Sequence, residues 1–254
     1  MNNGERVGRA GHMDNGLGRR PLPDGDVAHL EKYPIRQLLP TTAATVERTL
    51  ALPYTYRAKY DQGQEGACVG YAASWMMSIL NRRFYDAGWL YKTAQRDYDE
   101  WAGEDYSGTS VRAGMEVLRS VGHRFLHRHT HEHAPLIEDG IHEYRWATTV
   151  DEVRTCLAAG VPVTLGVDWM SNFDSPTKKS DGSRWIGEGD LGQVRGGHAI
   201  TCYGASDRRQ AIKLTNSWGK SWPLVWMPYD TLQKLLDGVS QPGEAAIVTD
   251  RIQS

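Results

Sequence analysis

The 254-residue sequence has few cysteines and no long apolar run, and each absence excludes a class of protein. Its three cysteines, Cys68, Cys156 and Cys202, are too few for the disulfide framework of a small secreted domain. No run of about 18 apolar residues could span a membrane, and the N-terminus lacks the apolar core of a signal peptide. We therefore expect a cytoplasmic protein in which Cys156 and Cys202 are buried structural thiols.

An excess of charge of one sign is also absent. The 29 basic and 31 acidic residues leave a net charge of −2, which gives no sign of a basic nucleic-acid-binding surface. Hydrophobic residues make up 40% and charged residues 24%, as in ordinary globular proteins. The length fits one large domain or two small ones. We expect no nucleic-acid or membrane partner, and the sequence leaves the oligomeric state open.

A polar, glycine-punctuated stretch leads into Cys68, where an apolar segment begins. This change of composition predicts a helix that starts at the cysteine. Unsatisfied N–H groups at a helix start favour negative charge, so a thiol there is shifted toward the nucleophilic thiolate. A single cysteine is more often a small core residue, and the functional interpretation therefore depends on groups elsewhere in the chain.

Two downstream segments contain the groups that a thiolate nucleophile requires. His198 lies at the start of one apolar, β-prone run, GGHAITCY, and Asn216 ends another, AIKLTNSWG. His198 would exchange protons with Cys68, and Asn216 would orient the imidazole. The side-chain N–H of Gln62, together with the backbone N–H of Cys68, would form a two-donor oxyanion hole.

These motifs, in this order, resemble those of the papain-like (C1) cysteine peptidases. His198 follows Cys68 by 130 residues (198 − 68) and Asn216 follows it by 148 (216 − 68), and both offsets lie in the range of roughly 130–150 known for papain. The resemblance covers most of 53–252. It implies an α+β fold of two lobes, one helical and one barrel-like, with the active site in the cleft between them. It also implies a protein or peptide substrate and no cofactor or metal.

The resemblance extends to residues that would face the substrate. Gly108 and Thr109 match the glycine-containing segment that lines the cleft in bacterial members. Gly66 would allow close approach of a substrate, and Gly197 would leave the cleft wall open. Trp218 would shield the imidazole from water, and plain core packing is the alternative role for this side chain.

The sequence departs from the family pattern at two places. The family usually has Cys-Gly-Ser-Cys-Trp around the nucleophile, whereas this chain has Glu-Gly-Ala-Cys-Val at 65–69. The missing upstream cysteine removes a common disulfide, which fits a reducing compartment. After Trp222 the glycine-rich hairpin of the family is replaced by PLVWMP, which predicts a trimmed loop.

Two other functions remain open at this point. One is a non-catalytic binding module that kept the fold, and the other is a different cysteine-dependent acyl transferase or amidase. Relatives with the second kind of chemistry more often use aspartate as the third residue, so Asn216 favours a peptidase.

A histidine tract invites a metal-site interpretation. Its histidines alternate, and on an extended strand all would lie on one face; they are His127, His129, His131 and His133. No cysteine pair or helical HExxH motif accompanies them. A solvated linker between the lobes is favoured, and no metal site is expected.

The N-terminal region divides into two parts. Residues 1–25 contain six glycines and few apolar residues, which predicts a mobile tail. Residues 26–52 carry two short helical patterns, Val27–Tyr33 and Thr42–Leu50, and would form a short pro-segment or a structural wrap. The peptidase-like domain would then occupy 53–254.

Within that domain the pattern predicts helices first and strands later. Helices are expected at Cys68–Arg83, Leu90–Trp101, Ser110–Val121, Thr149–Gly160 and Thr231–Leu236. Strands are expected at Tyr144–Ala147, Val161–Val167, His198–Tyr203, Ala211–Thr215 and Ala245–Val248, with a loop over Ser171–Arg195.

Overall fold

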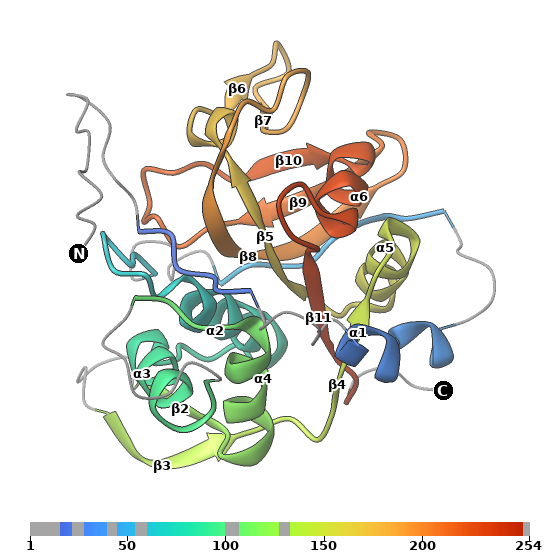
Figure 1. Cartoon of the computed structure of the whole chain (residues 1–254). Helices are drawn as coiled ribbons and strands as arrows, with labels where there is room; N and C mark the ends of the chain where they lie inside the picture. Colours follow the sequence, from blue (N-terminus) through green and yellow to red (C-terminus); the bar gives the residue numbers. More distant parts are fainter. Residues whose placement is uncertain are drawn as a thin grey trace.

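The computed structural model describes residues 16–21, 28–39, 45–53, 60–99, 107–126 and 133–250. It has a helical lobe and a lobe built on a large sheet, so the predicted two-lobe α+β organisation is confirmed (Figure 1). The helical lobe contains α2 (Cys68–Asn81), α3 (Ala87–Asp97), α4 (Val111–Ser120) and the pair β2 (His123–Leu126) and β3 (His133–Asp139).

The large sheet forms the body of the second lobe. Its strands lie in the order β4 (Tyr144–Ala147), β11 (Glu244–Val248), β5 (Val163–Met170), β8 (Val194–Ser206), β9 (Ala211–Thr215), β10 (Val225–Pro228), β7 (Arg184–Trp185) and β6 (Thr177–Lys178). All these pairs are antiparallel except β10 with β7. Two helices, α5 (Val150–Ala159) and α6 (Tyr229–Asp237), pack against this sheet.

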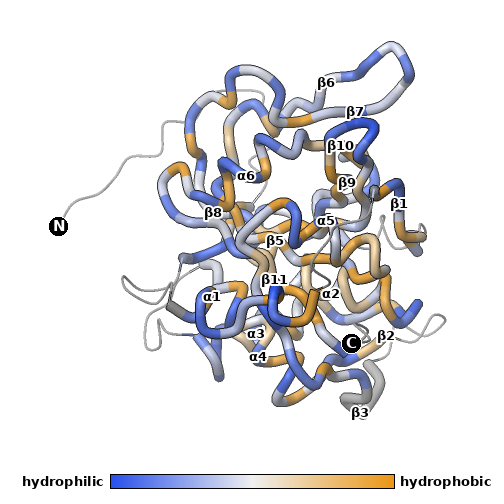
Figure 2. Tube along the Cα trace, turned by 90° about the vertical axis from the view of Figure 1, so that its right-hand side faces the viewer, coloured by the Kyte–Doolittle hydropathy of each residue, from blue (hydrophilic) through white to orange (hydrophobic). Residues whose placement is uncertain are grey.

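Each lobe buries its own set of apolar side chains, and α2 lies where the two sets meet. The tube coloured by hydropathy shows apolar stretches gathered around α2 and β5 (Figure 2). The core of the helical lobe also includes Trp146, Ala199 and Ala246 from the sheet. Burial of these shared residues removes apolar surface from water at the junction, so α2 is held firmly against β8.

Glycine lets α2 and α3 approach closely. A Cβ atom at Gly70 would lie 2.5 Å from the carbonyl oxygen of Ala87 and 2.8 Å from Cβ of Tyr91. Real side chains do not tolerate such contacts, so the absence of a side chain at Gly70 sets this helix spacing.

The helix caps follow the sequence closely. The Ser110 hydroxyl accepts from the Ala113 N–H at 3.0 Å at the start of α4. Thr149 and Glu152 form a reciprocal capping box at the start of α5. Gly160 ends that helix with φ +92°, a left-handed conformation that glycine adopts readily.

Three predicted elements are wrong or incomplete. The described part of Thr42–Leu50 is not helical: Glu47–Thr49 forms β1, which pairs antiparallel with β8. The loop predicted over Ser171–Arg195 contains a 3₁₀ turn (Ser171–Asp174), β6 and β7. The trimmed loop after Trp222 leads directly into β10. β1 and β7 are each stabilised by a partner distant in sequence, β8 and β10, and a local pattern does not reveal such partners; β6 pairs with the nearby β7.

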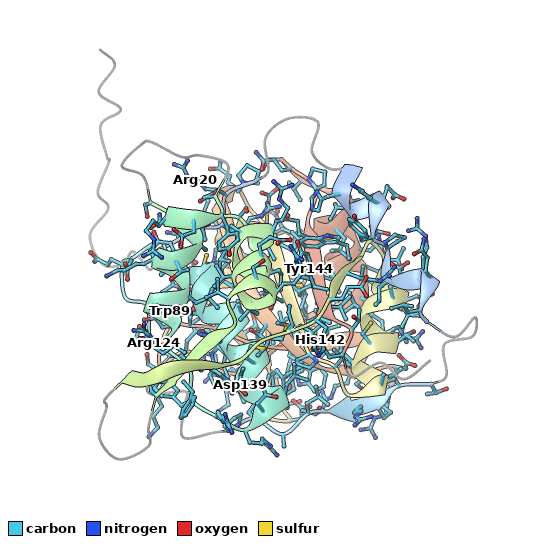
Figure 3. The ribbon with its side chains drawn as sticks, turned by 90° about the horizontal axis from the view of Figure 1, so that it is seen from below. Arg20, Trp89, Arg124, Asp139, His142 and Tyr144 are labelled. Carbon is cyan, nitrogen blue, oxygen red and sulfur yellow. The ribbon has the colours of Figure 1, made fainter. Side chains whose placement is uncertain are left out.

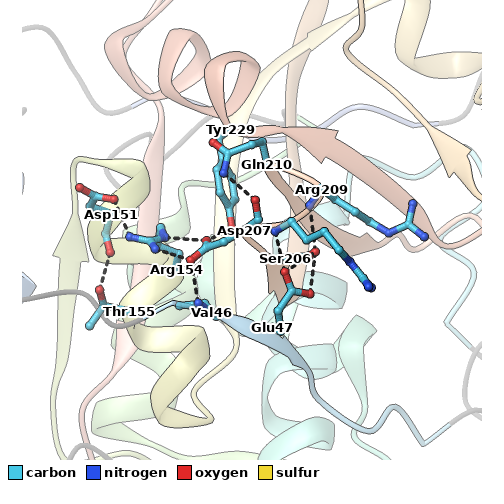
Figure 4. A network of polar contacts seen from close by, with 11 residues as sticks. Val46, Glu47, Asp151, Arg154, Thr155, Ser206, Asp207, Arg209, Gln210 and Tyr229 are labelled. Atoms are coloured by element: carbon cyan, nitrogen blue, oxygen red, sulfur yellow. Dashed lines mark hydrogen bonds and ion pairs between the residues drawn. The ribbon is translucent and has the colours of Figure 1, made fainter.

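A polar network fastens β1 and α5 to the turn after β8 (Figure 4). Arg154 donates to both carboxylate oxygens of Asp207, from Nε at 3.0 Å and from a terminal nitrogen at 2.5 Å. The same carboxylate accepts from the Val46 N–H at 2.7 Å and the Tyr229 hydroxyl at 2.9 Å. One aspartate therefore joins three segments of the chain.

The N-terminal extension packs on the sheet lobe where it is described. Helix α1 (Ala28–Lys32) lies against β4, and Pro34 forms a bridge with Trp146. Cys156 and Cys202 are buried and free, as predicted. No helix within the described ranges is long and apolar enough to cross a membrane.

The histidine tract falls largely outside the described residues. His127, His129 and His131 are not described, and of His133 only the backbone, at the start of β3, is described.

Candidate active site

Cys68 is the first residue of α2, and its thiol lies against β8. Its Sγ accepts from the backbone N–H of Ala199 at 3.3 Å. The N–H groups of Gly18 and Val69 also point at this sulfur. The side chain is fully buried. Ala199 follows His198 directly, so the contact brings together two parts of the chain that the sequence predicted to meet.

The hydrogen bonds of His198 assign its tautomer. Its Nε2 lies 2.9 Å from Oδ1 of Asn216, and that oxygen also accepts from the N–H of Ser217 at 2.8 Å. Because the asparagine oxygen is an acceptor, Nε2 must carry the hydrogen and Nδ1 must have a free lone pair. Nδ1 is buried and has no hydrogen-bond partner among the described residues.

Tryptophan rings surround the imidazole. The His198 ring lies 4.8 Å from the Trp169 ring and 5.0 Å from the Trp218 ring, measured between centroids. Trp218 is itself buried. These rings exclude water from the contact between His198 and Asn216, which is consistent with the shielding expected of Trp218.

Burial keeps the thiol and the imidazole neutral in this structure. It raises the pKa of Cys68 to about 11, against the opposing effect of the N–H groups of Ala199, Gly18 and Val69. It lowers the pKa of His198 to about 4, although the hydrogen bond to Asn216 acts in the other direction. A charged thiolate–imidazolium pair therefore requires that water or a substrate first reach the site.

Gln62 is held by hydrogen bonds at both ends of its amide. Its Oε1 accepts from the Ser217 hydroxyl, which fixes the amide orientation. Its Nε2 donates to the carbonyl oxygens of Glu65 at 2.7 Å and Gly16 at 3.0 Å. The donor expected at an oxyanion is thus bonded to a carbonyl of the chain itself.

Residues 16–21 run between the two lobes, past the thiol (Figure 1, dark blue). The Arg19 N–H donates to the Gly197 carbonyl at 3.0 Å. On the opposite wall, the Thr109 N–H donates to the Gly18 carbonyl at 2.9 Å, and the Arg20 N–H donates to the Thr109 carbonyl at 2.9 Å. Composition predicts a mobile tail over 1–25. For residues 16–21 this prediction is wrong, because hydrogen bonds to Gly197 and Thr109 hold the segment in place.

The glycines predicted to face a substrate lie against this segment. A Cβ atom at Gly66 would lie 3.4 Å from Cα of Gly18, and one at Gly108 would lie 2.4 Å from its carbonyl oxygen. A Cβ atom at Gly197 would lie 2.1 Å from the Arg19 carbonyl oxygen. These three glycines therefore lie along the backbone of residues 18 and 19, where a side chain would collide with it.

Solved structures with this arrangement of elements are cysteine proteases. Xylellain from Xylella fastidiosa has a TM-score of 0.62 at 20% identity, covering 96% of this chain and 98% of its own. The proform of Amb a 11 from ragweed pollen has a TM-score of 0.53 at 16% identity, covering 80% and 72%. Procathepsin L2 from Tenebrio molitor has a TM-score of 0.53 at 14% identity, covering 91% and 83%. The fold is papain-like.

At 14–20% sequence identity, the similarity to these structures shows the fold alone. No protein-family model matches the chain, and no curated protein matches it. The activity of this papain-like chain must therefore be argued from its own residues.

Sequence reasoning missed two residues of this papain-like cleft. The buried side chain of Arg19 forms an ion pair with Glu244, at the start of β11, at 3.1 Å. Neither residue has a local signature, because 225 positions separate them in the chain. Among the described residues, no group of three or more histidine, cysteine, aspartate or glutamate side chains could hold a metal ion.

Proposed function

We propose that the protein is a cysteine peptidase that hydrolyses peptide bonds with Cys68 as nucleophile. The observation that carries the proposal is the hydrogen-bonding state of His198, whose Nε2 is bonded to Asn216 and whose Nδ1 has no partner in the part of the chain that the structure describes. A base needs this tautomer to accept the thiol proton. The papain-like fold and the cysteine proteases that share it support the same function.

The reaction follows from these groups. Nδ1 of His198 takes the Cys68 proton, and the sulfur attacks the carbonyl carbon of the scissile bond. The oxyanion accepts hydrogen bonds from Gln62 Nε2 and the Cys68 N–H. Collapse breaks the C–N bond, and the imidazolium gives its proton to the departing amine. Water, deprotonated by the imidazole, then hydrolyses the thioester and restores the thiol.

Residues 16–21 must leave the cleft before a substrate can enter. They form hydrogen bonds with both walls of the cleft. The Gly16 carbonyl also accepts the hydrogen bond from Gln62 Nε2 that the oxyanion requires. We therefore assign the cleft-covering role to residues 16–21 rather than to 26–52. Two of the similar structures are of proforms, which supports a latent state for this chain.

The test compares the full chain with its Arg19→Ala variant, which loosens the segment, and with the double variant that also carries Cys68→Ala. We expect Arg19→Ala to cleave a peptide library and to be labelled at Cys68 by an epoxide probe for papain-like enzymes. The double variant should do neither. Labelling without cleavage of any peptide would contradict peptidase activity and favour a binding module or another acyl-transfer reaction.

A further inference from the structure

Helix α3 holds the backbone of Gly108 with two side chains. The Gly108 N–H donates to the Tyr91 hydroxyl at 3.0 Å, and Nε2 of Gln95 donates to the Gly108 carbonyl at 2.8 Å. Because four residues separate Tyr91 from Gln95, both side chains leave the same face of the helix. One helix face therefore binds both polar groups of a single backbone residue.

Gly108 has a backbone conformation that requires such support. Its φ of +100° lies in the region that favours glycine, and glycine loses more conformational freedom than other residues when it is fixed. The contacts are shielded from water, since Gly108 is buried and Tyr91 is only 4% exposed. Loss of either contact would leave a buried peptide group without its partner, which favours rotation of the peptide.

The Gly108 carbonyl and the Thr109 N–H belong to one planar peptide group. In a trans peptide these two bonds point in opposite directions. Gln95 therefore binds the rear of the group, while the Thr109 N–H points into the cleft and donates to the Gly18 carbonyl at 2.9 Å. The Thr109 carbonyl accepts from the Arg20 N–H at 2.9 Å. The contact with Gln95 thus sets the direction in which this wall of the cleft donates.

This wall has no covalent fastening, because all three cysteines of the chain are free. The loop before the nucleophile approaches it closely: a Cβ atom at Gly66 would lie 2.2 Å from Oγ of Ser107 and 3.1 Å from the nitrogen of Gly108. A wall in such close contact with the loop tolerates little displacement. The hydrogen bonds from α3 therefore contribute to holding it in register with the nucleophile.

The direction of a substrate follows from the contacts of the covering segment. The Gly18 N–H points at the Cys68 sulfur. Toward its N-terminal end the segment meets Gln62, on the side where Asn216 and Ser217 lie beside the imidazole. The imidazole gives its proton to the departing amine on that side. The acyl half of a substrate therefore lies on the other side, along Thr109.

We propose that Tyr91 and Gln95 are positioning residues, which orient the Gly108–Thr109 peptide to bind the backbone of the acyl half of a substrate. This inference rests on the proposed peptidase function. A substrate would replace Gly18 and Arg20 as the partner of the Thr109 N–H and carbonyl. Tyr91 and Gln95 need not touch the substrate, because both act through Gly108.

The test uses two fluorogenic substrates with the same leaving amine. One has four residues before the cut, and the other has a single residue with no preceding peptide group to bind Thr109. The readout is the ratio of their kcat/KM values, which does not depend on the fraction of molecules with an open cleft, because that fraction scales both values equally. Tyr91→Phe and Gln95→Met should each lower this ratio by about 3–10-fold, the effect of one hydrogen bond.

Two control variants match these changes without touching Gly108. Tyr33→Phe removes the hydroxyl of a tyrosine that is 46% exposed, and Lys92→Met changes an exposed residue of α3. Both should keep the ratio of the unaltered chain. Cleavage of the single-residue substrate, expressed per site titrated with the epoxide probe, should stay unchanged in Tyr91→Phe and Gln95→Met and shows that both are folded.

Two outcomes refute the positioning role and leave the peptidase function standing. One is an unchanged ratio in either test variant. The other is an equal loss on both substrates, which a merely structural role of the two side chains would produce. Epoxide labelling of Cys68 in the Arg19→Ala chain without cleavage of either substrate would refute the function and the inference together.

Discussion

The imidazole of His198 depends on one hydrogen bond, from Nε2 to Asn216, for the tautomer that the proposed chemistry needs. Replacing His198 by alanine removes the proton carrier, and kcat should fall by about 10²–10⁴-fold. Asn216→Ala should cost less, because the ring remains and only its orientation is released. Steady-state cleavage assays on Arg19→Ala enzyme, normalised by epoxide titration of active sites, measure both effects. Equal losses would contradict the orienting role.

Gln62 is the second residue whose removal has a defined cost. Gln62→Ala should lower kcat by about 10²–10³-fold, because it removes one of two oxyanion donors. The variant also frees the Gly16 carbonyl, so rates must again be expressed per titrated site. Gln64→Ala, two residues away and exposed, is the matched control. An unchanged kcat in Gln62→Ala would remove this glutamine from the oxyanion hole.

At the scale of elements, the segment 16–21 behaves as an extra strand held in the cleft. A Cβ atom on Gly18 would lie 1.9 Å from the Gly66 carbonyl oxygen, so Gly18→Ala should expel the segment. We expect faster alkylation of Cys68 by iodoacetamide at pH 7, because water can then support the thiolate whose pKa burial had raised.

The control for this prediction is Gly88→Ala in α3. A Cβ atom there meets only an oxygen of Asp86 at 3.7 Å, so alkylation should remain as slow as in the unaltered chain. Alkylation of Gly18→Ala at the same slow rate would show that the segment does not control access to the thiol.

The elements also show where sequence reasoning succeeds and where it stops. The predicted nucleophile, base and orienting residue come together because their motifs lie on or directly beside strongly patterned elements, α2, β8 and β9. Composition predicts a tail at 16–21, because glycines bury little surface of their own. Its order comes from Thr109 and Gly197, which are remote in sequence. The same cause explains β1, which forms only against β8.

For the whole molecule, buried histidines couple folding to pH. The Ser74 hydroxyl donates to the Gly70 carbonyl at 2.7 Å, so Nε2 of His123 must donate to Ser74, and the buried Nδ1 has no partner within the described ranges. Burial lowers the pKa of His123 to about 3. The unfolded chain binds a proton below about pH 6.5, whereas the folded chain does not until about pH 3.

The free energy of unfolding should therefore fall as the pH drops from 6.5 toward 3. His198 contributes with the same sign down to about pH 4. Each histidine accounts for a slope of up to about 1.4 kcal/mol per pH unit. Urea midpoints between pH 7 and 4 should change less in His123→Gln than in the unaltered chain. The exposed His142, labelled in Figure 3, provides the control, since His142→Gln should leave the slope unchanged.

The Asp207 network predicts a second effect on global stability. Asp207→Asn removes the charge that binds Arg154 and should lower the free energy of unfolding by about 2–3 kcal/mol. Asp151→Asn changes another partner of the same arginine, but Asp151 is 78% exposed and should cost less than about 1 kcal/mol. Urea unfolding at pH 7 compares the two variants. Equal losses would show that the Asp207 network does not carry the stability assigned to it.

The enclosure of the Cys68 thiol has a consequence for redox damage. Peroxide oxidises thiolates that it can reach, and this sulfur is both protonated and sealed under residues 16–21. While residues 16–21 cover the thiol, Cys68 should thus remain reduced under oxidising conditions that would convert an uncovered Cys68 to sulfinic acid. Sensitivity to peroxide should begin only when the segment departs, so under the proposed function the movement that admits a substrate also exposes the thiol to oxidation.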